Sequence, residues 1–347
     1  MEARIIGGGI AGLAAAAGLT RAGWRVHVYE RAPALANDGT GLGMWPNAVR
    51  ALAELGLADE LRRRGKPQRP GVIQRWDGRT LVEIDTTRIR RRAGEDVYVV
   101  ARPDLLGLLF ESLPDGTVHF GREWEGEADV VIGADGAHSA VRRRLFGARH
   151  GLRDTGYTVW RSVIDFGVRH AGEVWGPRAK FGYSPLTPDR TNFYAVLETP
   201  LVPRTLDEDH RALLAHFGEW PDPVASVLRR ADPERMLRHR LHYLAPSLPS
   251  YVVGNTVLVG DAAHTMTPDL GQGACQALVD GLTLARCLAR AVTEEDVRTG
   301  LREYDRRRRR PTQRIAAAAR WLGWISTVRH GTGIRDALLR TVGSLAA

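Results

Sequence analysis

Cysteine is scarce in this chain of 347 residues, which contains only Cys275 and Cys287. Two cysteines do not make the disulfide framework on which small exported domains depend. The apolar stretch 5–19 follows Glu2 and Arg4 rather than a basic leader, and it runs directly into a charged strand. We therefore interpret it as folded structure and not as an export signal. Both observations favour a protein of the reducing cytoplasm.

Long hydrophobic runs are also missing. No segment approaches about 18 uninterrupted apolar residues, so the sequence predicts no membrane span. Internal repeats and low-complexity linkers are absent as well. Hydrophobic residues make up 44% of the chain and charged residues 26%, an ordinary globular composition. The length then suggests about two domains.

Lysine is nearly absent, because only Lys66 and Lys180 occur among 49 basic residues and the rest are arginine. The net charge of +9 raises the question of an acidic partner such as nucleic acid. The arginine runs 62–64, 142–144 and 306–310 fall on predicted helices, where charge runs are usually solvated faces. We therefore predict no nucleic-acid partner, while some of these arginines could bind the phosphate of NADPH.

The chain opens with a strand at 3–6, a glycine-rich turn, a helix of small residues to about Ala22 and a second strand at 25–29. The turn matches G-x-G-x-x-G, and Glu30 follows at the end of the second strand. In this context the turn predicts a dinucleotide site, with phosphates at the helix N-terminus and ribose hydroxyls on Glu30. The alternative is a glycine-rich turn without a ligand. The turn residues expected to bind are Gly7, Gly9, Ile10, Ala11 and Gly12.

Further α/β segments occur in the middle and near the end of the chain. We expect buried strands at 130–132 and 256–259, a hairpin at 72–84, and strand-like segments over 157–200. Helices are expected at 47–61 with Asn47 as a possible N-cap, from Arg102, over 273–290, and from Arg302 onward. The pattern predicts an α/β fold with one nucleotide-binding domain of discontinuous pieces (1–70, 95–155 and 250–305). It also predicts a β-rich domain with an antiparallel sheet (71–94 and 156–249) and a C-terminal helical segment (306–347).

Two later motifs follow predicted buried strands. The first is Asp129-Val-Val-Ile-Gly-Ala-Asp135-Gly136-Ala-His-Ser139. The second spans 257–278 and contains Gly260-Asp261-Ala-Ala-His264-Thr-Met-Thr-Pro268-Asp-Leu-Gly271-Gln-Gly273. Simple helix capping is the alternative for Asp135 and Asp261. Further segments recur in the same order: Glu30-Arg31, Gly41-Leu-Gly-Met-Trp-Pro-Asn47, Arg102-Pro-Asp-Leu-Leu, and Gly156-Tyr-Thr-Val-Trp160-Arg161.

Together these motifs resemble the FAD-dependent aromatic-ring hydroxylases, the group A flavoprotein monooxygenases of the para-hydroxybenzoate hydroxylase type. Salicylate-hydroxylase-like, urate-hydroxylase-like and zeaxanthin-epoxidase-like members share the pattern. The resemblance implies a Rossmann-like FAD-binding domain of the GR2 type with an inserted substrate domain. It implies reduction by NADPH or NADH, reaction with O2 through a C4a-hydroperoxyflavin, and hydroxylation or epoxidation of an aromatic or polycyclic molecule. No obligatory catalytic side chain and no metal are expected.

The resemblance also implies site residues. Beyond the opening turn, the expected FAD-side residues are Glu30, Arg31, Gly43, Arg102, Trp124, Asp135, Asp261, Pro268, Gly271, Gln272, Gly273 and Ala274. Substrate-side candidates are Trp45, Trp160, Arg161, Lys180, Tyr183, Tyr194 and Pro268, with Met44 near the flavin ring. For Lys180 a surface position is an equal alternative. The segment from Val118 to Asp129 is shorter than in relatives, which puts an adenine contact by Trp124 in question.

Alternatives to a hydroxylase are a flavin reductase or halogenase on the same scaffold, or a flavin-binding protein without turnover. The halogenase-type Trp-x-Trp-x-Ile-Pro segment is absent from the sequence. Trp321 and Trp324 lie in the helical tail, where we expect core packing rather than a membrane or dimer surface. A homodimer remains open, and the substrate itself is not identified.

Overall fold

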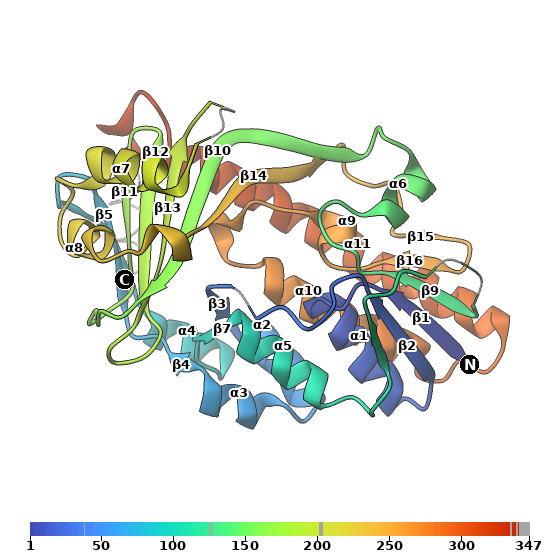
Figure 1. The fold of residues 1–347 in the computed structure, drawn as a ribbon. Coiled ribbons are helices and arrows are strands. Elements are labelled where there is room, and N and C mark those ends of the chain that lie inside the picture. The colour runs from blue at the N-terminus through green and yellow to red at the C-terminus, as the bar shows by residue number, and fades with distance from the viewer. Residues whose placement is uncertain are drawn as a thin grey trace.

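The computed structural model describes residues 1–37, 39–124, 126, 128–200, 204–333, 335–337 and 339. Its elements form two lobes, one around a mostly parallel sheet and one around a mostly antiparallel sheet (Figure 1). A small third sheet lies near the place where the lobes meet. Within the described part of the chain, no helix is both long and apolar enough to cross a bilayer.

The first sheet has six strands in the order β15-β16-β9-β1-β2-β8, and only the β15–β16 pair is antiparallel. Its strands are β1 (Glu2–Ile6), β2 (Arg25–Glu30), β8 (Val118–Phe120), β9 (Val130–Gly133), β15 (Val252–Val253) and β16 (Thr256–Leu258). Ile5 aligns with Val28 on one side and with Ile132 on the other. The strands come from the start, middle and end of the chain, so the predicted Rossmann-like α/β fold is confirmed.

Helices α1 (Ile10–Arg21) and α10 (Gly273–Leu288) pack closely against each other. A Cβ at Gly281 would lie 2.5 Å from the amide nitrogen of Ala15, and one at Gly18 would lie 2.5 Å from the Cβ of Ala285. Only small residues permit this approach, which explains why the first helix is rich in alanine and glycine. This lobe also contains α6 (Ala140–Phe146), α9 (Asp261–His264) and the short 3-10 helix η2 (Pro268–Leu270).

The second sheet has seven strands in the order β14-β10-β13-β12-β11-β5-β6. Its strands are β5 (Gly71–Arg75), β6 (Thr80–Ile84), β10 (Gly151–Ile164), β11 (Gly172–Gly176), β12 (Ala179–Pro185), β13 (Thr191–Glu198) and β14 (Leu237–Ala245). The expected hairpin forms β5 and β6. The expected antiparallel pairing holds for every strand pair but one of this sheet, because β5 runs parallel to β11. The β5–β6 hairpin precedes the other strands of this sheet in the sequence and extends the sheet beyond β11.

One face of the seven-stranded sheet is covered by α7 (Leu206–Phe217) and α8 (Val224–Arg229), as Figure 1 shows. Aromatic side chains fill this interface, including Phe181, Phe193 and Phe217. The 3-10 helix η1 (Pro233–Arg235) leads from α8 into β14. Since successive residues of a strand point to opposite faces, every second residue of β10, β12 and β13 is directed away from α7.

The third sheet consists of β3 (Gly41–Met44), β7 (Tyr98–Ala101) and β4 (Lys66–Pro67). The predicted single helix over 47–61 is wrong, because Gly56 at φ 71° separates α2 (Pro46–Glu54) from α3 (Ala58–Arg64). Asn47 is not the cap. Trp45 holds the N-cap position and Pro46 begins the helix, where its fixed φ is already helical. The remaining helices here are α4 (Thr86–Ala93) and α5 (Arg102–Glu111).

The long helix α11 (Glu294–Ser326) begins eight residues before the expected start at Arg302. Trp321 and Trp324 are 64% and 66% exposed, so the expectation that they pack in the core is wrong. Two arginines of the supposedly solvated runs are buried instead, Arg142 at 4% and Arg308 at 8% exposure. Each of the two guanidinium groups donates hydrogen bonds to groups inside the protein.

Candidate functional site

In the opening glycine turn, Gly7 and Gly12 are closely packed, whereas Gly9 between them has open space beside its Cα. Gly7 has φ 109°, and a Cβ there would lie 2.4 Å from the carbonyl oxygen of Ala134. A Cβ at Gly12 would lie 2.0 Å from the carbonyl oxygen of Gly7, whereas one at Gly9 would meet nothing within 4 Å. Gly7 and Gly12 are thus needed by the protein's own packing. Gly9 leaves free space at the N-terminus of α1, where Ile10 and Ala11 begin the helix, a favourable place for a phosphate.

Glu30 lies beside this turn at the end of β2. Its carboxylate accepts hydrogen bonds from the backbone N–H of Gly8 at 2.7 Å and of Ala32 at 2.8 Å. Arg31, the next residue, is exposed. Trp124, from the shortened segment after β8, stacks on Tyr29 with ring centroids 5.9 Å apart. Its indole therefore packs against β2.

Asp135 is already engaged with α6. Its carboxylate accepts hydrogen bonds from Ser139 Oγ at 2.5 Å and from the N–H groups of Ala140 and Val141 at 2.7 and 3.1 Å. These contacts match the helix-capping alternative, and Ser139 itself caps the helix through the N–H of Arg142. An FAD contact by Asp135 stays a prediction.

Arg142 joins this motif to the second one. Its guanidinium donates to the carbonyl oxygens of Ala137 at 2.6 Å and of Ala262 at 3.0 Å, and to Asp261 O at 3.4 Å. Burial lowers the pKa of Arg142, against the opposing charges of Asp135 and Asp261. Sequence reasoning placed this residue on a solvated face. The signal that could have found it is its position directly after the Asp135 turn.

Asp261 is the first residue of the Asp261 loop, which we define as residues 261–273. Its side chain is open to solvent, and its carboxylate accepts no hydrogen bond from any residue that the structure describes. The nearby protein atoms desolvate this carboxyl and so raise its pKa, although the positive charges of His264, Arg142 and Arg102 act in the opposite direction. A carboxylate that the protein itself does not use is available to the hydroxyl groups of a ligand. Arg102, at the start of α5, lies close enough for its charge to act on this group.

A buried polar network lies behind the loop. Asp280 of α10 accepts hydrogen bonds from Gly260 N at 2.8 Å, His264 Nε2 at 2.5 Å and Arg308 Nε at 2.6 Å. Arg308 also donates to Gln276 Oε1 at 2.6 Å. Burial opposes ionisation of Asp280, but Arg308 and His264 outweigh it and lower the pKa to about 2. The network fixes the turn before Asp261 to α10 and α11.

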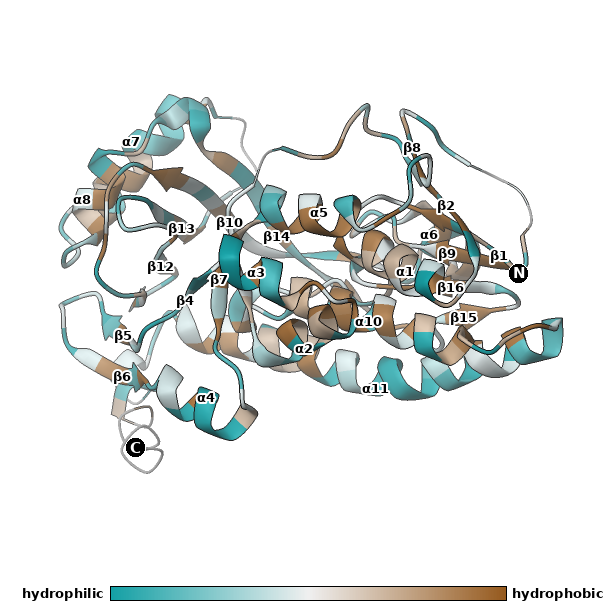
Figure 2. Cartoon of the chain, turned by 90° about the horizontal axis from the view of Figure 1, so that it is seen from below, coloured by the Kyte–Doolittle hydropathy of each residue, from teal (hydrophilic) through white to brown (hydrophobic). Residues whose placement is uncertain are grey.

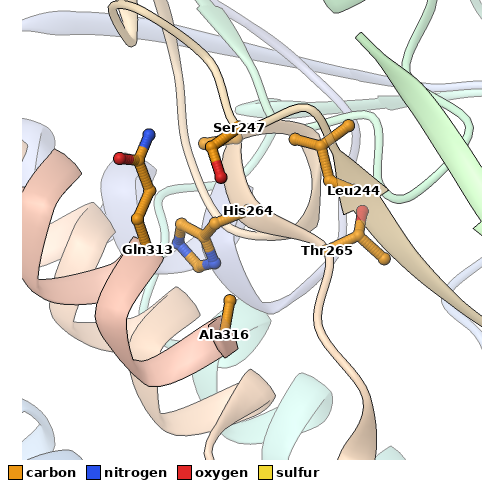
Figure 3. Close-up of a pocket in the computed structure, with 7 residues that line it drawn as sticks. Leu244, Ser247, His264, Thr265, Gln313 and Ala316 are labelled. Carbon is orange, nitrogen blue, oxygen red and sulfur yellow. The ribbon is translucent and has the colours of Figure 1, made fainter. Parts of the chain in front are cut away.

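A small cavity adjoins His264 (Figure 3). Its volume of about 10 Å³ is the least that can admit one water molecule and is far too small for an organic ligand. The lining includes Ser247, Thr265 and Gln313. His264 Nδ1 is buried without a partner among the described residues, so a single water there would complete its hydrogen bonding.

The rest of the predicted flavin side gathers around the start of α10. Trp45 lies by Gly271, since a Cβ at Gly271 would be 3.3 Å from its Nε1. Gln272 accepts a hydrogen bond from Asn47 Nδ2 at 3.2 Å. Met44 is fully buried and cannot frame a flavin ring, so that expectation is wrong. Of the others, Pro268 is exposed on η2, Gly273 and Ala274 form the first turn of α10, and Gly43 accepts through its carbonyl oxygen from Cys275 Sγ at 3.2 Å.

The substrate-side candidates divide between the two faces of the seven-stranded sheet. Trp160 is buried against α7, where its Nε1 donates to Asp209 at 2.9 Å, and Tyr183 belongs to the same helix-covered core. Neither placement agrees with a pocket-lining role. Tyr194 and Arg161 are directly paired across β13 and β10. Together with Lys180 they lie on the opposite face.

Lys180 is buried at 2% exposure, so the surface alternative is wrong. Its Nζ lies 2.7 Å from Asp269 Oδ1 and 3.3 Å from Glu173 Oε1. Tyr194 Oη donates to the same Glu173 oxygen, and we call these four residues the Lys180 cluster. A Cβ at Gly182 would clash with the Tyr194 ring at 2.1 Å, so this glycine lets the ring lie across the sheet toward Glu173. Sequence reasoning missed Glu173 and Asp269, although Asp269 directly follows Pro268 in the motif.

The pKa values of Lys180 and Tyr194 determine the protonation states of the Lys180 cluster. Burial would lower the pKa of Lys180, but Glu173 and Asp269 outweigh it and raise the pKa to about 12. Burial and the charge of Glu173 raise the pKa of Tyr194 well above its ordinary value. Lys180 is therefore a cation neutralised by two carboxylates, and Tyr194 is a neutral phenol.

Arg161 differs from Lys180 because it has no carboxylate partner. Its side chain makes no hydrogen bond or ion pair with any described residue, and burial lowers its pKa. A partly buried guanidinium without a counter-ion is an anion-binding group. It lies beside Tyr194, on the same sheet face as Lys180.

Comparison with known proteins decides the family. A model of the FAD binding domain family matches residues 1–129 and 117–319. The chain belongs to this family. It is 30% identical over 364 residues to an aurachin C monooxygenase/isomerase of Stigmatella aurantiaca, covering 98% of this chain and 94% of that protein. It is 35% identical over 328 residues to a 2-heptyl-3-hydroxy-4(1H)-quinolone synthase of Pseudomonas aeruginosa, covering 83% and 81%.

A solved structure agrees with these relatives. Klebsiella pneumoniae HpxO complexed with FAD and uric acid superposes with a TM-score of 0.89 at 25% identity, covering 99% of this chain and 93% of that one. FAD as cofactor and the resemblance to group A flavoprotein monooxygenases are confirmed by these matches. NAD(P)H as reductant is typical of the family.

Proposed function

We propose that this chain is an FAD-dependent monooxygenase that uses NADPH or NADH and O2 to hydroxylate or epoxidise an aromatic or polycyclic small molecule with an acidic group. The observation that carries the proposal is Arg161, whose guanidinium has no counter-ion among the described residues and lies on the sheet face that the Lys180–Asp269 ion pair joins to the Asp261 loop. The relatives named above support the aromatic class, and uric acid, bound in HpxO, is itself an acid.

The residues present fit FAD. The free space at Gly9 and the N-terminus of α1 would accept the pyrophosphate, and the free Asp261 carboxylate would hold ribitol or ribose hydroxyls. The N-terminus of α10, at Gly273 and Ala274, would face the flavin with its positive end. When bound, FAD supplies the redox chemistry, namely acceptance of hydride from NAD(P)H and activation of O2.

The chain's own residues would bind and orient the substrate. Arg161 offers an unpaired charge to an acidic group of the substrate, and the neutral Tyr194 lies opposite it on the paired strand. Lys180 does not serve this purpose, because its charge is already balanced by two carboxylates. Its role is to hold the Asp261 loop at a fixed distance from the sheet.

We propose that FAD binding and substrate binding are divided between the two domains expected from the sequence. The pieces 1–70, 95–155 and 250–305 would hold FAD, and 71–94 with 156–249 would hold the substrate. The expected boundary at residue 305 falls inside α11, which runs on as one continuous helix. The C-terminal segment is therefore better grouped with the FAD-binding pieces.

The test is ligand-stimulated oxidation of NAD(P)H by the purified yellow protein. Acidic heteroaromatics such as hydroxyquinolones and purine diones are screened with product detection by mass spectrometry. A substrate gaining one oxygen atom supports the proposal. NAD(P)H oxidation without an oxygenated product would point to a reductase, and bound flavin without NAD(P)H oxidation would point to a binding protein.

Arg161→Gln tests the substrate class separately. A charged hydrogen bond contributes about 1.5–3 kcal/mol, so KM for an acidic substrate should rise roughly tenfold to a hundredfold. Arg153→Gln is the matched control, because Arg153 is an exposed arginine on the same strand. Equal KM values for the two variants would remove Arg161 from substrate binding.

A further inference from the structure

The excess positive charge of the chain is concentrated in one segment. Residues 306–335 contain nine arginines and no lysine, aspartate or glutamate. This number equals the net charge of +9, so the rest of the chain carries as many acidic as basic side chains. Most of the segment is the second half of α11, which runs along one edge of the molecule (Figure 2).

Five exposed residues of α11 form a continuous stripe. They are spaced alternately by four and three positions, which places them on one face of a helix. We call this set the α11 stripe: Arg310, Arg314, Ala317, Trp321 and Trp324. At 1.5 Å per residue it is roughly 20 Å long, basic at one end and aromatic at the other. Exposed tryptophan pairs of this kind are uncommon on a surface that only meets water.

The charges of the stripe are not used within the protein. Arg308 pairs with Asp280 and Arg309 with Asp305. By contrast, Arg310 and Arg314 make no hydrogen bond or ion pair in the part of the chain that the structure describes. Their guanidinium groups are free to meet external anions.

The aromatic end of the stripe lies near the candidate site. Gly323, between the two tryptophans, packs so closely on the loop that a Cβ there would lie 2.5–3.1 Å from the Asp269 carboxyl atoms. Trp321 and Trp324 project from the outer side of the same turn. Whatever binds them is therefore about one helix diameter, roughly 10 Å, from the Lys180 cluster.

We propose that the α11 stripe is a peripheral docking surface for a bilayer that contains anionic lipid. Arginines attract the negative surface of such a bilayer, and tryptophan prefers the boundary between headgroups and acyl chains. A strip of roughly 20 Å by 10 Å is much smaller than the roughly 800 Å² per partner that a stable dimer buries. Nucleic-acid sites interleave aromatic and basic residues along a groove, whereas here they occupy separate ends. The inference does not depend on the substrate.

The experiment is co-sedimentation of the FAD-loaded full chain with vesicles of pure phosphatidylcholine or of phosphatidylcholine with 30% phosphatidylglycerol. We expect binding to the anionic vesicles only, weakened by salt, with a blue shift of tryptophan fluorescence. Arg310→Glu/Arg314→Glu should reduce the bound fraction about tenfold or more. Trp321→Ala/Trp324→Ala should also reduce it and abolish the blue shift.

The matched controls are Arg211→Glu/Arg229→Glu, two exposed arginines elsewhere, and Trp76→Ala, an exposed tryptophan of the β5–β6 hairpin. They should bind vesicles like the parent protein, and all variants should retain flavin and their melting temperature. Equal vesicle binding by the stripe variants and the controls would overturn the proposal. So would stripe-dependent dimerisation in sedimentation velocity without vesicle binding, or tighter stripe-dependent binding to single-stranded RNA than to anionic vesicles.

Discussion

Lys180 and Asp269 form an ion pair of 2.7 Å that crosses from the seven-stranded sheet to the Asp261 loop. Both side chains are buried, at 3% and 5% exposure. Glu173, on the neighbouring strand, shares the lysine. The pair thus links the two lobes directly, because Lys180 belongs to the seven-stranded sheet and Asp269 to the Asp261 loop.

Replacement of Lys180 by methionine should destabilise the protein by about 3–5 kcal/mol, because two buried carboxylates lose their counter-ion. Urea denaturation followed by far-UV circular dichroism measures the loss. Lys66→Met is the natural control, since Lys66 is the only other lysine and is half-exposed. Adding Asp269→Asn to Lys180→Met should recover part of the stability, and a simple sum of the two losses would argue against a coupled pair.

The glycine turn at residues 7–12 and its role in binding a dinucleotide could be predicted from sequence, because the motif lies within one short segment of the chain. Gly12 is required by a contact with Gly7 inside the first strand–turn–helix unit, and Asp261 directly follows a short buried strand. The contacts of Asp269, Arg142 and Arg308 could not be predicted this way. Their partners lie 89, 120 and 28 positions away and meet only when the fold closes.

The sequence also could not predict that the substrate-side candidates lie on two different faces of the seven-stranded sheet, and the reason is a different one. Neighbouring strand residues point to opposite faces, so Trp160 and Arg161 cannot both reach one pocket. Sequence alone does not say which face α7 will cover. The structure assigns Trp160 to the helix side and Arg161 to the other, and the same alternation separates Tyr183 from Tyr194.

Asp280 should make stability depend on pH in the acid range. Its pKa is lowered to about 2 from 3.8, so its ionised form stabilises the folded state by roughly 2 kcal/mol above about pH 4. That contribution is lost as the pH falls from about 4 to 2, because the unfolded state then binds the proton first. We expect Asp280→Asn to be less stable than the parent at pH 6 and the gap to narrow below pH 4. The check is a denaturation series from pH 3 to 7, and a gap that stays constant would assign the effect to other carboxyls.

Asp261 and Asp135 should behave oppositely when each is changed to alanine. Asp261 accepts no hydrogen bond from the described residues, so Asp261→Ala should yield mostly colourless protein whose flavin-free form melts like the flavin-free parent. Asp135 caps α6, so Asp135→Ala should cost about 1 kcal/mol of stability even without flavin. Absorbance at purification and melting of the flavin-free proteins give both answers. Full flavin retention by Asp261→Ala would contradict its assigned role.

Gly9→Ala and Gly12→Ala compare a ligand position with a packing position in the same turn. The methyl group of Gly9→Ala meets no protein atom within 4 Å, so the flavin-free protein should keep its stability. It would occupy the space expected for the pyrophosphate, and FAD affinity should fall about tenfold or more, by at least 1.4 kcal/mol. In Gly12→Ala the methyl group would lie 2.0 Å from Gly7 O, which should destabilise the fold by about 3 kcal/mol or more. Fluorescence titration with FAD and thermal melting separate the two effects, and unchanged FAD affinity in Gly9→Ala would mean that the phosphates bind elsewhere.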